Sequence, residues 1–235
     1  MINIKRLFFV FAFMAYFFSV DEIIAQKINQ FDVNKKRTGV WKKYYPNKRI
    51  RYSGQFKDGK EIGIFKFYDI STSKNPTIIK KFNIDNDSVF VQFFKSKAIL
   101  ESEGYMIGKN RVGKWKYFFA DGKILSEENY KNGLLDGKFI NFYPNGKTVE
   151  KSFYKNGLKN GVSEKYSSAG VLIESVEYIN DKENGKAKYF DLKGNLKESG
   201  IYKDGKRVGK WEYYLDGEII DEKKATKKKI FINKN

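Results

Sequence analysis

Cysteine and histidine are both absent from this chain of 235 residues. The absence of cysteine excludes disulfide bonds, thiol nucleophiles and the attachment of a lipid to an N-terminal cysteine. The absence of histidine excludes histidine-based catalytic triads and nearly all zinc-type sites. We therefore expect the protein to use no metal ion and no cofactor.

A pair of carboxylates is the catalytic device that this composition still permits, as in glycosidases. The candidates are Glu150, Glu174 and Glu198, which are evenly spaced along the chain. A catalytic pair is usually a singular feature, whereas these residues recur at one position of a repeat. We interpret them as a solvated ladder that faces cross-strand lysines, and we expect that the protein is not an enzyme.

A sustained helical periodicity of apolar residues is also absent, and a repeat with a period of about 24 residues is present instead. The eight blocks begin at Gly39, Gly63, Val89, Gly113, Gly137, Gly161, Gly185 and Gly209. Their spacing is constant except between the second and third blocks, where it is two positions longer. A fixed period indicates an array of repeated units with an extended surface, rather than a globule with one pocket.

Each block contains two short runs of residues that are separated by turn signals. Asn-Gly and Asp-Gly pairs, which supply the positive φ angles of tight turns, recur at intervals of roughly 11 or 12 residues. This pattern predicts one β-hairpin per block. The expected fold is all-β, an elongated, twisted, single-layer antiparallel sheet of about 16 strands that spans on the order of 70 Å.

An aromatic residue stands five positions after the start of every block. These aromatics are Tyr44, Tyr68, Phe94, Phe118, Phe142, Tyr166, Phe190 and Tyr214. We interpret them as a structural column, because stacking of repeats needs an aromatic in each unit. A second apolar position, two residues after the start, carries Trp41, Trp115 and Trp211. Since a single layer cannot bury both of its faces, we take these tryptophans as a candidate binding surface.

The second and fifth positions of a block have opposite parity along a strand. An undistorted strand would point them to opposite faces of the sheet. Either a β-bulge turns one of them, or both faces carry an aromatic column. The sequence leaves both alternatives open.

The second and third blocks depart from the pattern. Val89 replaces the first glycine of the third block, and a two-residue insertion lies within Asp69–Asp87. The insertion is either a lengthened loop or a loop specialised for contact with a partner.

The opening Gly-x-Trp-x-x-Tyr and the ending Tyr-Lys-Asn-Gly resemble the bacterial variant of the MORN repeat. Gly113, Trp115 and Phe118 carry the opening, and Tyr130–Gly133 carries the ending. The resemblance covers residues 39–222 and implies stacked hairpins with a role in binding or scaffolding. Proteins of this kind are often labelled antitoxins of toxin–antitoxin systems, which implies an immunity-like alternative function.

The segment 1–25 resembles a secretory signal peptide. Lys5 and Arg6 precede an uncharged run from Leu7 to Val20, and Ala25 is a small residue at a plausible cleavage site. This uncharged run is short for a membrane span, which needs about 20 residues. We therefore expect an exported protein, with a retained membrane anchor as the alternative. Residues 26–38 form an N-terminal lead-in, and residues 223–235 form a basic C-terminal tail.

The formal net charge is +18, from 46 basic and 28 acidic residues. This excess either attracts an anionic partner or reflects solvated lysines without a specific role. We expect an exported scaffold that binds a protein partner at the cell envelope or outside the cell. Anionic lipid or a surface glycan is the alternative ligand. We expect no nucleic acid partner, because of export, and the sequence leaves the oligomeric state open.

Overall fold

The computed structural model describes residues 27–72, 74–83 and 86–221. The predicted signal peptide at residues 1–25 and the predicted tail at residues 223–235 lie outside these described residues. Within them the chain is almost entirely β-strand, with one short 3₁₀ turn at Ser96–Ala98. No helix in the described part is long and apolar enough to cross a membrane.

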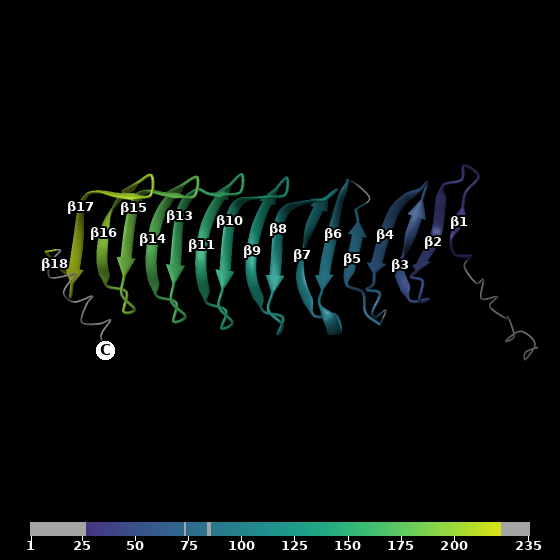
Figure 1. Cartoon of the computed structure of the whole chain (residues 1–235), viewed down its shortest axis with the longest axis horizontal. Coiled ribbons are helices and arrows are strands. Elements are labelled where there is room, and N and C mark those ends of the chain that lie inside the picture. The colour runs from purple at the N-terminus through teal and green to yellow at the C-terminus, as the bar shows by residue number, and fades with distance from the viewer. Residues whose placement is uncertain (1–26, 73, 84–85, 222–235) are drawn as a thin grey trace, which may run out of the picture.

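The strands lie side by side in chain order, in a single elongated row (Figure 1). Apart from β12 and β13, which both pair with β11, each strand pairs antiparallel with the next one along the chain. The strands are β1 (Gln30–Phe31), β2 (Arg37–Tyr44), β3 (Ile50–Lys57), β4 (Lys60–Phe67), β5 (Ile78–Phe82), β6 (Ser88–Phe94), β7 (Leu100–Ile107), β8 (Asn110–Phe118), β9 (Ile124–Lys131), β10 (Leu134–Phe142), β11 (Thr148–Lys155), β12 (Leu158–Lys159), β13 (Gly161–Tyr166), β14 (Leu172–Ile179), β15 (Lys182–Phe190), β16 (Leu196–Lys203), β17 (Lys206–Leu215) and β18 (Glu218–Ile220). The predicted all-β, single-layer antiparallel sheet is confirmed.

The described residues contain 18 strands where about 16 were expected. One additional strand is β1, which precedes the first block. The other arises because the chain is interrupted at Asn160, so that β12 and β13 both pair with β11.

The turns that end the blocks join each hairpin to its neighbour. Asn132 and Gly133 have φ angles of 52° and 85°, the left-handed values that the Asn-Gly pair was expected to supply. The Gly133 N–H donates to the carbonyl oxygen of Arg111 at 3.0 Å, and the Gly157 N–H donates to that of Leu135 at 2.7 Å. The same bond recurs at other turns, so main-chain hydrogen bonds connect successive hairpins along this edge.

Side chains make equivalent links at the opposite ends of the strands. The Tyr45 hydroxyl donates to the carbonyl oxygen of Tyr68 at 2.8 Å, and the Tyr143 hydroxyl donates to that of Tyr166 at 2.9 Å. Both edges of the row are therefore fastened from one repeat to the next.

The two faces of the sheet differ in burial. We call the side that carries Trp115, Tyr117 and Tyr130 the inner face, and the side that carries Lys114 and Lys116 the outer face. The most deeply buried side chains are on the inner face, among them Phe65, Val91, Trp115, Ser152 and Ser163, each with 0% of its surface exposed. In a single layer such burial requires that neighbours on the same face close over these side chains.

Both faces of the sheet carry aromatic residues. Of the two alternatives for the second and fifth positions of a block, the structure therefore shows an aromatic position on each face. The Tyr166 hydroxyl donates to the Glu164 carboxylate at 2.6 Å, and the Lys151 ammonium lies 5.2 Å from the Tyr166 ring. Lys151 is the direct cross-strand partner of Glu164, so all three side chains are on the outer face, opposite the buried Ser163. A register shift occurs next to this position, between Lys165 and Tyr166, yet the ring still faces outward.

The insertion in the second block forms part of the loop between β4 and β5. This loop is held to the preceding turn, because Asn47 and Arg49 both donate to the carbonyl oxygen of Ile70, at 3.1 and 3.2 Å. The Asp69 carboxylate accepts hydrogen bonds from the N–H and hydroxyl of Ser71. A partner-binding role for this loop stays a prediction.

Candidate functional site

The inner face is built from cross-strand pairs of complementary size. An aromatic ring of one strand lies directly over a glycine of the strand before it. A Cβ atom added to Gly54, Gly104 or Gly200 would lie 2.4, 2.4 or 2.2 Å from a ring atom of Phe65, Trp115 or Trp211 respectively. The glycines therefore leave the volume that the rings occupy.

In the sixth and seventh blocks, where the aromatic is missing, both members of the pair are small. The hydroxyl oxygens of Ser152 and Ser163 are 2.8 Å apart, and Val176 lies directly opposite Ala187. The second position of the block therefore changes from Trp to Ser and Ala because its partner on the preceding strand changes from Gly to Ser and Val. The sequence interpretation missed this coupling, although the constant spacing of the two positions is visible in the sequence.

Trp115 is not part of a surface, and its prediction as a binding residue was wrong. Its side chain is 0% exposed. The ring covers Gly104 and lies 6.2 Å from the Phe93 ring and 6.4 Å from the Tyr130 ring, and its Nε1–H donates to the Tyr105 carbonyl at 2.9 Å. Burial of so large a ring and its polar N–H indicates a structural role.

Trp41 and Trp211 are partly buried. The Trp41 ring is packed between Phe31 at 5.2 Å and Phe56 at 5.6 Å, and its Nε1–H donates to the carbonyl of Thr38 at 3.1 Å. Trp211 lies at the other end of the row, 5.1 Å from the Tyr202 ring. Of the three candidate residues, Trp211 lines a hollow at the surface.

An arginine precedes each of the three tryptophans by four positions. The guanidinium carbon atoms of Arg37, Arg111 and Arg207 lie 5.1, 4.7 and 4.0 Å from the centroids of the tryptophan rings. Such cation–π contacts stabilise both partners. The shared spacing Arg-x-Gly-x-Trp is a sequence signal that the interpretation above did not use.

The aromatic column at the fifth position of the blocks lies near the turns. Two of its members, Tyr166 and Tyr214, donate hydrogen bonds to the outer-face carboxylates of Glu164 and Glu212. Tyr44 is 48% exposed, and the other members of the column are partly buried. The ring-to-ring contacts of the interior are made instead by inner-face residues such as Tyr52, Phe65 and Phe67. The structural role assigned to the outer column stays a prediction.

The three recurring glutamates lie on the inner face. Glu198 is 8% exposed, and the Glu150 and Glu174 side chains are 20% and 21% exposed, so the expected solvated ladder was wrong. Each carboxylate is compensated by a cation. Lys159 lies 2.6 Å from Glu150, Lys165 lies 2.9 Å from its cross-strand partner Glu174, and Arg207 binds Glu198.

Glu150 has the densest set of partners. Burial alone would raise its pKa, but hydrogen bonds from Lys159, Ser152 and Ser163 outweigh burial and hold the pKa below the usual value. A lowered pKa in the folded state stabilises the protein above the unfolded-state pKa of about 4.3, and this contribution is lost as the pH falls through the folded-state pKa.

Replacement Glu150→Gln is therefore expected to lower the free energy of unfolding by about 1 kcal/mol at pH 7, after discounting for partial exposure. The difference from the unmodified protein should shrink as the pH falls below about 4. Urea unfolding at pH 7, 5 and 3 measures this difference in the free energy of unfolding. A difference that is the same at all three values would contradict this role for the carboxylate.

Tyr178 is expected to destabilise the fold at high pH. Burial raises its pKa to about 12, and the charges of Glu174 and Glu183 act in the same direction. Since the unfolded-state value is about 10, this contribution is fully present below pH 10 and is lost as the pH rises through 12. Urea unfolding at pH 8, 10 and 11 should show a smaller alkaline loss for Tyr178→Phe. The exposed Tyr105→Phe variant is the control and should behave as the unmodified protein does.

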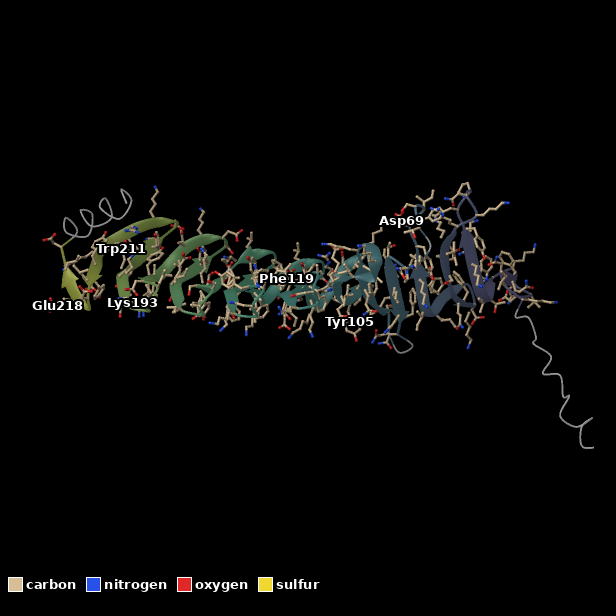
Figure 2. The ribbon with its side chains drawn as sticks, turned by 90° about the horizontal axis from the view of Figure 1, so that it is seen from below. Asp69, Tyr105, Phe119, Lys193, Trp211 and Glu218 are labelled. Atoms are coloured by element: carbon tan, nitrogen blue, oxygen red, sulfur yellow. The ribbon has the colours of Figure 1, made fainter. Side chains whose placement is uncertain are left out.

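The outer face combines exposed apolar side chains with lysines. Ile64, Tyr105, Phe153 and Ile201 are 52%, 47%, 47% and 52% exposed. The position that follows the first glycine of a block carries Lys114, Lys138, Lys186 and Lys210. Side chains project along the whole described row, with Tyr105 among those that point away from the ribbon (Figure 2). This face offers more area for contact than the self-paired inner face.

Acidic residues are scattered rather than gathered. No group of three or more carboxylates in the described part of the chain is placed to hold a metal ion. The expectation that the protein uses no cofactor and performs no catalysis stays a prediction.

Comparison with known families agrees with this geometry. The profile of the MORN repeat variant matches residues 37–58, 111–132, 135–156 and 183–204. The chain carries MORN repeats. Each matched MORN unit is one hairpin, such as β8 and β9 in residues 111–132. Two of the units begin at the arginine that contacts the tryptophan ring, Arg37 and Arg111. A search of curated proteins finds no match to the chain.

Proposed function

We propose that the protein is an exported, non-catalytic scaffold that binds a protein partner at the cell envelope or outside the cell. The observation that carries this proposal is the outer face, where exposed apolar side chains alternate with lysines along the length of the sheet. Apolar area with a polar surround is the usual anatomy of a protein interface. The inner face supports the fold, since its rings, carboxylates and cations are engaged with one another.

The lysines give the partner an expected chemistry. An acidic surface would be attracted by the column of Lys114, Lys138, Lys186 and Lys210, and complementary charge speeds encounter and selects the partner. Export rests on the leader sequence. The alternative function, neutralisation of a toxin, rests on the family resemblance alone. The crosslinking experiment below includes it as one possible outcome.

Site-specific photo-crosslinking in the native cells tests the proposal. A crosslinking amino acid at Phe153 on the outer face should yield an adduct with one protein, identified by mass spectrometry. The same amino acid at Tyr117, on the inner face, is the control and should yield none. Charge reversal of Lys138 and Lys186 to Glu should reduce the adduct several-fold.

The alternatives give different results. Adducts with lipid or glycan at Phe153 would replace the protein partner with an anionic surface. An adduct with a small toxic protein would identify an immunity-like function. Adducts at Tyr117 and none at Phe153 would overturn the assignment of the face.

A further inference from the structure

The third block differs from its neighbours at its first position, where valine replaces glycine. In the blocks on either side, which begin at Gly63 and Gly113, this glycine has a φ angle of 65°, and pairing with the preceding strand is interrupted next to it. A β-branched residue rarely adopts a positive φ angle, and Val89 does not. The strands β5 and β6 therefore pair without a register shift.

Uninterrupted pairing gives Phe90 a direct partner on each side, Lys81 on β5 and Tyr105 on β7. The row of direct partners continues to Ile64 on β4 and to Val112 on β8. In the fourth block, by contrast, the residue equivalent to Phe90 pairs with the following strand and not with the preceding one. An unbroken line of side chains thus crosses β4–β8.

This line lies on the outer face of the sheet. Val91, the neighbour of Phe90 along β6, is 0% exposed on the inner face, so Phe90 points the other way. The Phe90 and Tyr105 rings are 5.2 Å apart and inclined at 63°, and the Lys81 ammonium lies 5.9 Å from the Phe90 ring. Tyr105 is 47% exposed and points away from the ribbon (Figure 2). Two aromatic rings therefore meet on the outer face.

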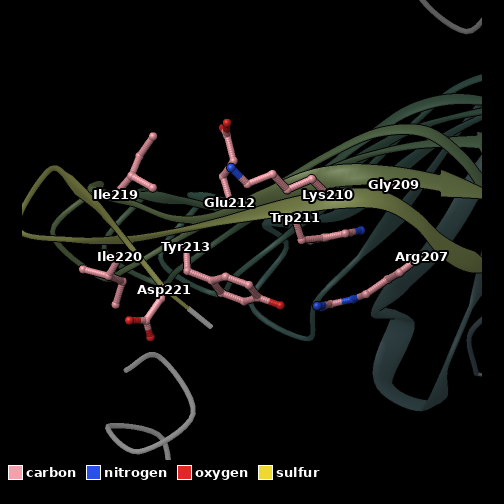
Figure 3. Close-up of a pocket in the computed structure, with 9 residues that line it drawn as sticks. All are labelled: Arg207, Gly209, Lys210, Trp211, Glu212, Tyr213, Ile219, Ile220 and Asp221. Carbon is pink, nitrogen blue, oxygen red and sulfur yellow. The ribbon is translucent and has the colours of Figure 1, made fainter. Parts of the chain in front are cut away.

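No other block in the described part of the chain places two apolar residues at these two outer-face positions. The equivalent cross-strand pairs are Val40 with Gln55, Ile64 with Lys81, Lys114 with Asn129, Lys138 with Phe153, Val162 with Glu177 and Lys186 with Ile201. In the eighth block the first position carries Lys210, which extends to the same side of β17 as Glu212 and away from Trp211 (Figure 3). Each of these blocks has a polar or charged side chain where the third block has a ring.

We call Ile64, Phe90, Tyr105, Ile107 and Val112 the outer patch. Ile64 and Ile107 are 52% and 50% exposed, and Phe90 and Val112 are partly buried. The line from Ile64 to Val112 crosses five neighbouring strands and therefore spans about 19 Å. Single exposed apolar residues are ordinary on a protein surface, whereas a group that includes aromatic rings and has a charged border marks an interaction site.

Two exposed lysines at the outer patch have uncharged cross-strand partners. Lys66 lies opposite Ser53 on one side and Ile79 on the other. Lys81 stands in the line itself, between two members of the patch. The directly facing residues therefore supply no carboxylate to either ammonium group.

The outer-face carboxylates of β7 and β9 have partners of their own. These are Glu101 with Lys95 at 3.3 Å, Glu103 with Gln92 at 3.1 Å and Glu127 with Lys114 at 3.4 Å. The side of the outer patch that carries Lys66 and Lys81 is thus positively charged. Such a border complements acidic groups on a bound molecule.

We propose that the outer patch binds an acidic segment of the protein partner. Carboxylates of this segment pair with Lys66 and Lys81, and an aromatic or aliphatic side chain packs on the rings of Phe90 and Tyr105. Aromatic anchors contribute much of the energy of protein interfaces, and complementary charge contributes speed and selectivity. The site rests on the proposed function only in that its occupant is a protein.

A short peptide tests this chemistry. The probe carries two phenylalanines flanked on each side by two glutamates, and it is titrated into the full ¹⁵N-labelled chain. Amide shifts are expected on β4–β8, centred on Phe90 and Tyr105. The control peptide has every glutamate replaced by lysine. It should bind about tenfold more weakly, since it replaces attraction to Lys66 and Lys81 with repulsion.

Reversal of the two lysine charges provides a second readout. The variant with Lys66→Glu and Lys81→Glu should exchange the preference, so that the lysine peptide binds more tightly. Both side chains are exposed, and the fold should therefore be kept. The variant with Lys138→Glu and Lys186→Glu is the matched control, because it makes the same change of charge elsewhere on the outer face. It should keep the preference for the acidic peptide.

Removal of the rings tests the apolar part of the site. The variant with Phe90→Ser and Tyr105→Ser should lose the peptide shifts. Phe153→Ser is its control, since it removes an outer-face ring from the fifth block, and it should bind the peptide as the unmodified chain does. If the double serine variant does not fold, the charge-reversed variant decides.

Several results would overturn the proposal. Equal affinity of the two peptides would exclude recognition of acidic groups, and shifts spread over β9–β17 would exclude the outer patch as the site. Binding that requires removal of residues 1–26 or 222–235 would show that the chain's own ends cover the patch. Patch resonances that change with protein concentration alone would show that a second copy does. Shifts with vesicles of phosphatidylglycerol and none with the peptide would replace the protein segment with a lipid surface.

Failure of this site and failure of the proposed function give different results. Peptide binding at the outer patch, without any crosslinked protein at Phe153, would leave the site standing and overturn the scaffold function. A crosslinked protein at Phe153, without peptide binding, would leave the scaffold function standing and overturn the site.

Discussion

Replacement of Trp115 with alanine is expected to lower the free energy of unfolding by about 3–5 kcal/mol. The side chain is 0% exposed and fills the space above Gly104. Its removal leaves a cavity that no neighbour can fill, because Gly104 has no side chain to move into it. The Arg111 guanidinium, 4.7 Å from the ring centroid, loses its cation–π partner as well.

Urea unfolding followed by far-ultraviolet circular dichroism measures this loss without relying on the deleted chromophore. Phe153→Ala is the matched control, because it also removes a ring but from the outer face, where 47% of the side chain is exposed. The control should cost about 1 kcal/mol or less. Equal losses from the two variants would show that the inner face is not the core of the sheet.

Replacement of Ser163 with tryptophan is expected to destabilise the protein by about 1–3 kcal/mol through overpacking. The Ser163 hydroxyl oxygen lies 2.8 Å from that of Ser152, and both side chains are 0% exposed, so no room is available for a ring. The additional change Ser152→Gly should restore most of the stability, because it recreates the Gly104 and Trp115 pair.

A double-mutant cycle on Ser152 and Ser163 measures this rescue. The variant Ser152→Gly alone is expected to be less stable than the unmodified protein, since it removes a hydrogen-bonded hydroxyl and leaves a small void. If the double variant loses as much stability as the two single variants together, the two positions are not complementary in size.

The hairpins could be predicted because the signals that form them are local. Asn132 and Gly133 adopt left-handed φ angles as their residue types favour, and the repeat of such pairs sets the length of each strand. A single layer followed from joining one hairpin per block, end to end, into one sheet. Family resemblance and turn chemistry agreed at this level.

The burial of individual side chains could not be predicted in the same way. Trp115 was assigned to a surface, since a sheet of one layer was expected to leave one ring in each block in solvent. Its actual environment depends on Gly104 in the neighbouring strand, and this contact becomes visible only when the register is known. The burial of Glu198 similarly depends on Arg207, which lies on the neighbouring strand.

The pairing of strands that are close in the sequence has a consequence for how the molecule assembles. Closing a hairpin of this array brings together residues no more than about 20 positions apart, so the entropic cost of loop closure stays small for a β-protein. A chain that emerges from its N-terminus first can add one hairpin at a time onto a finished edge. The edge that grows throughout this process is the C-terminal one.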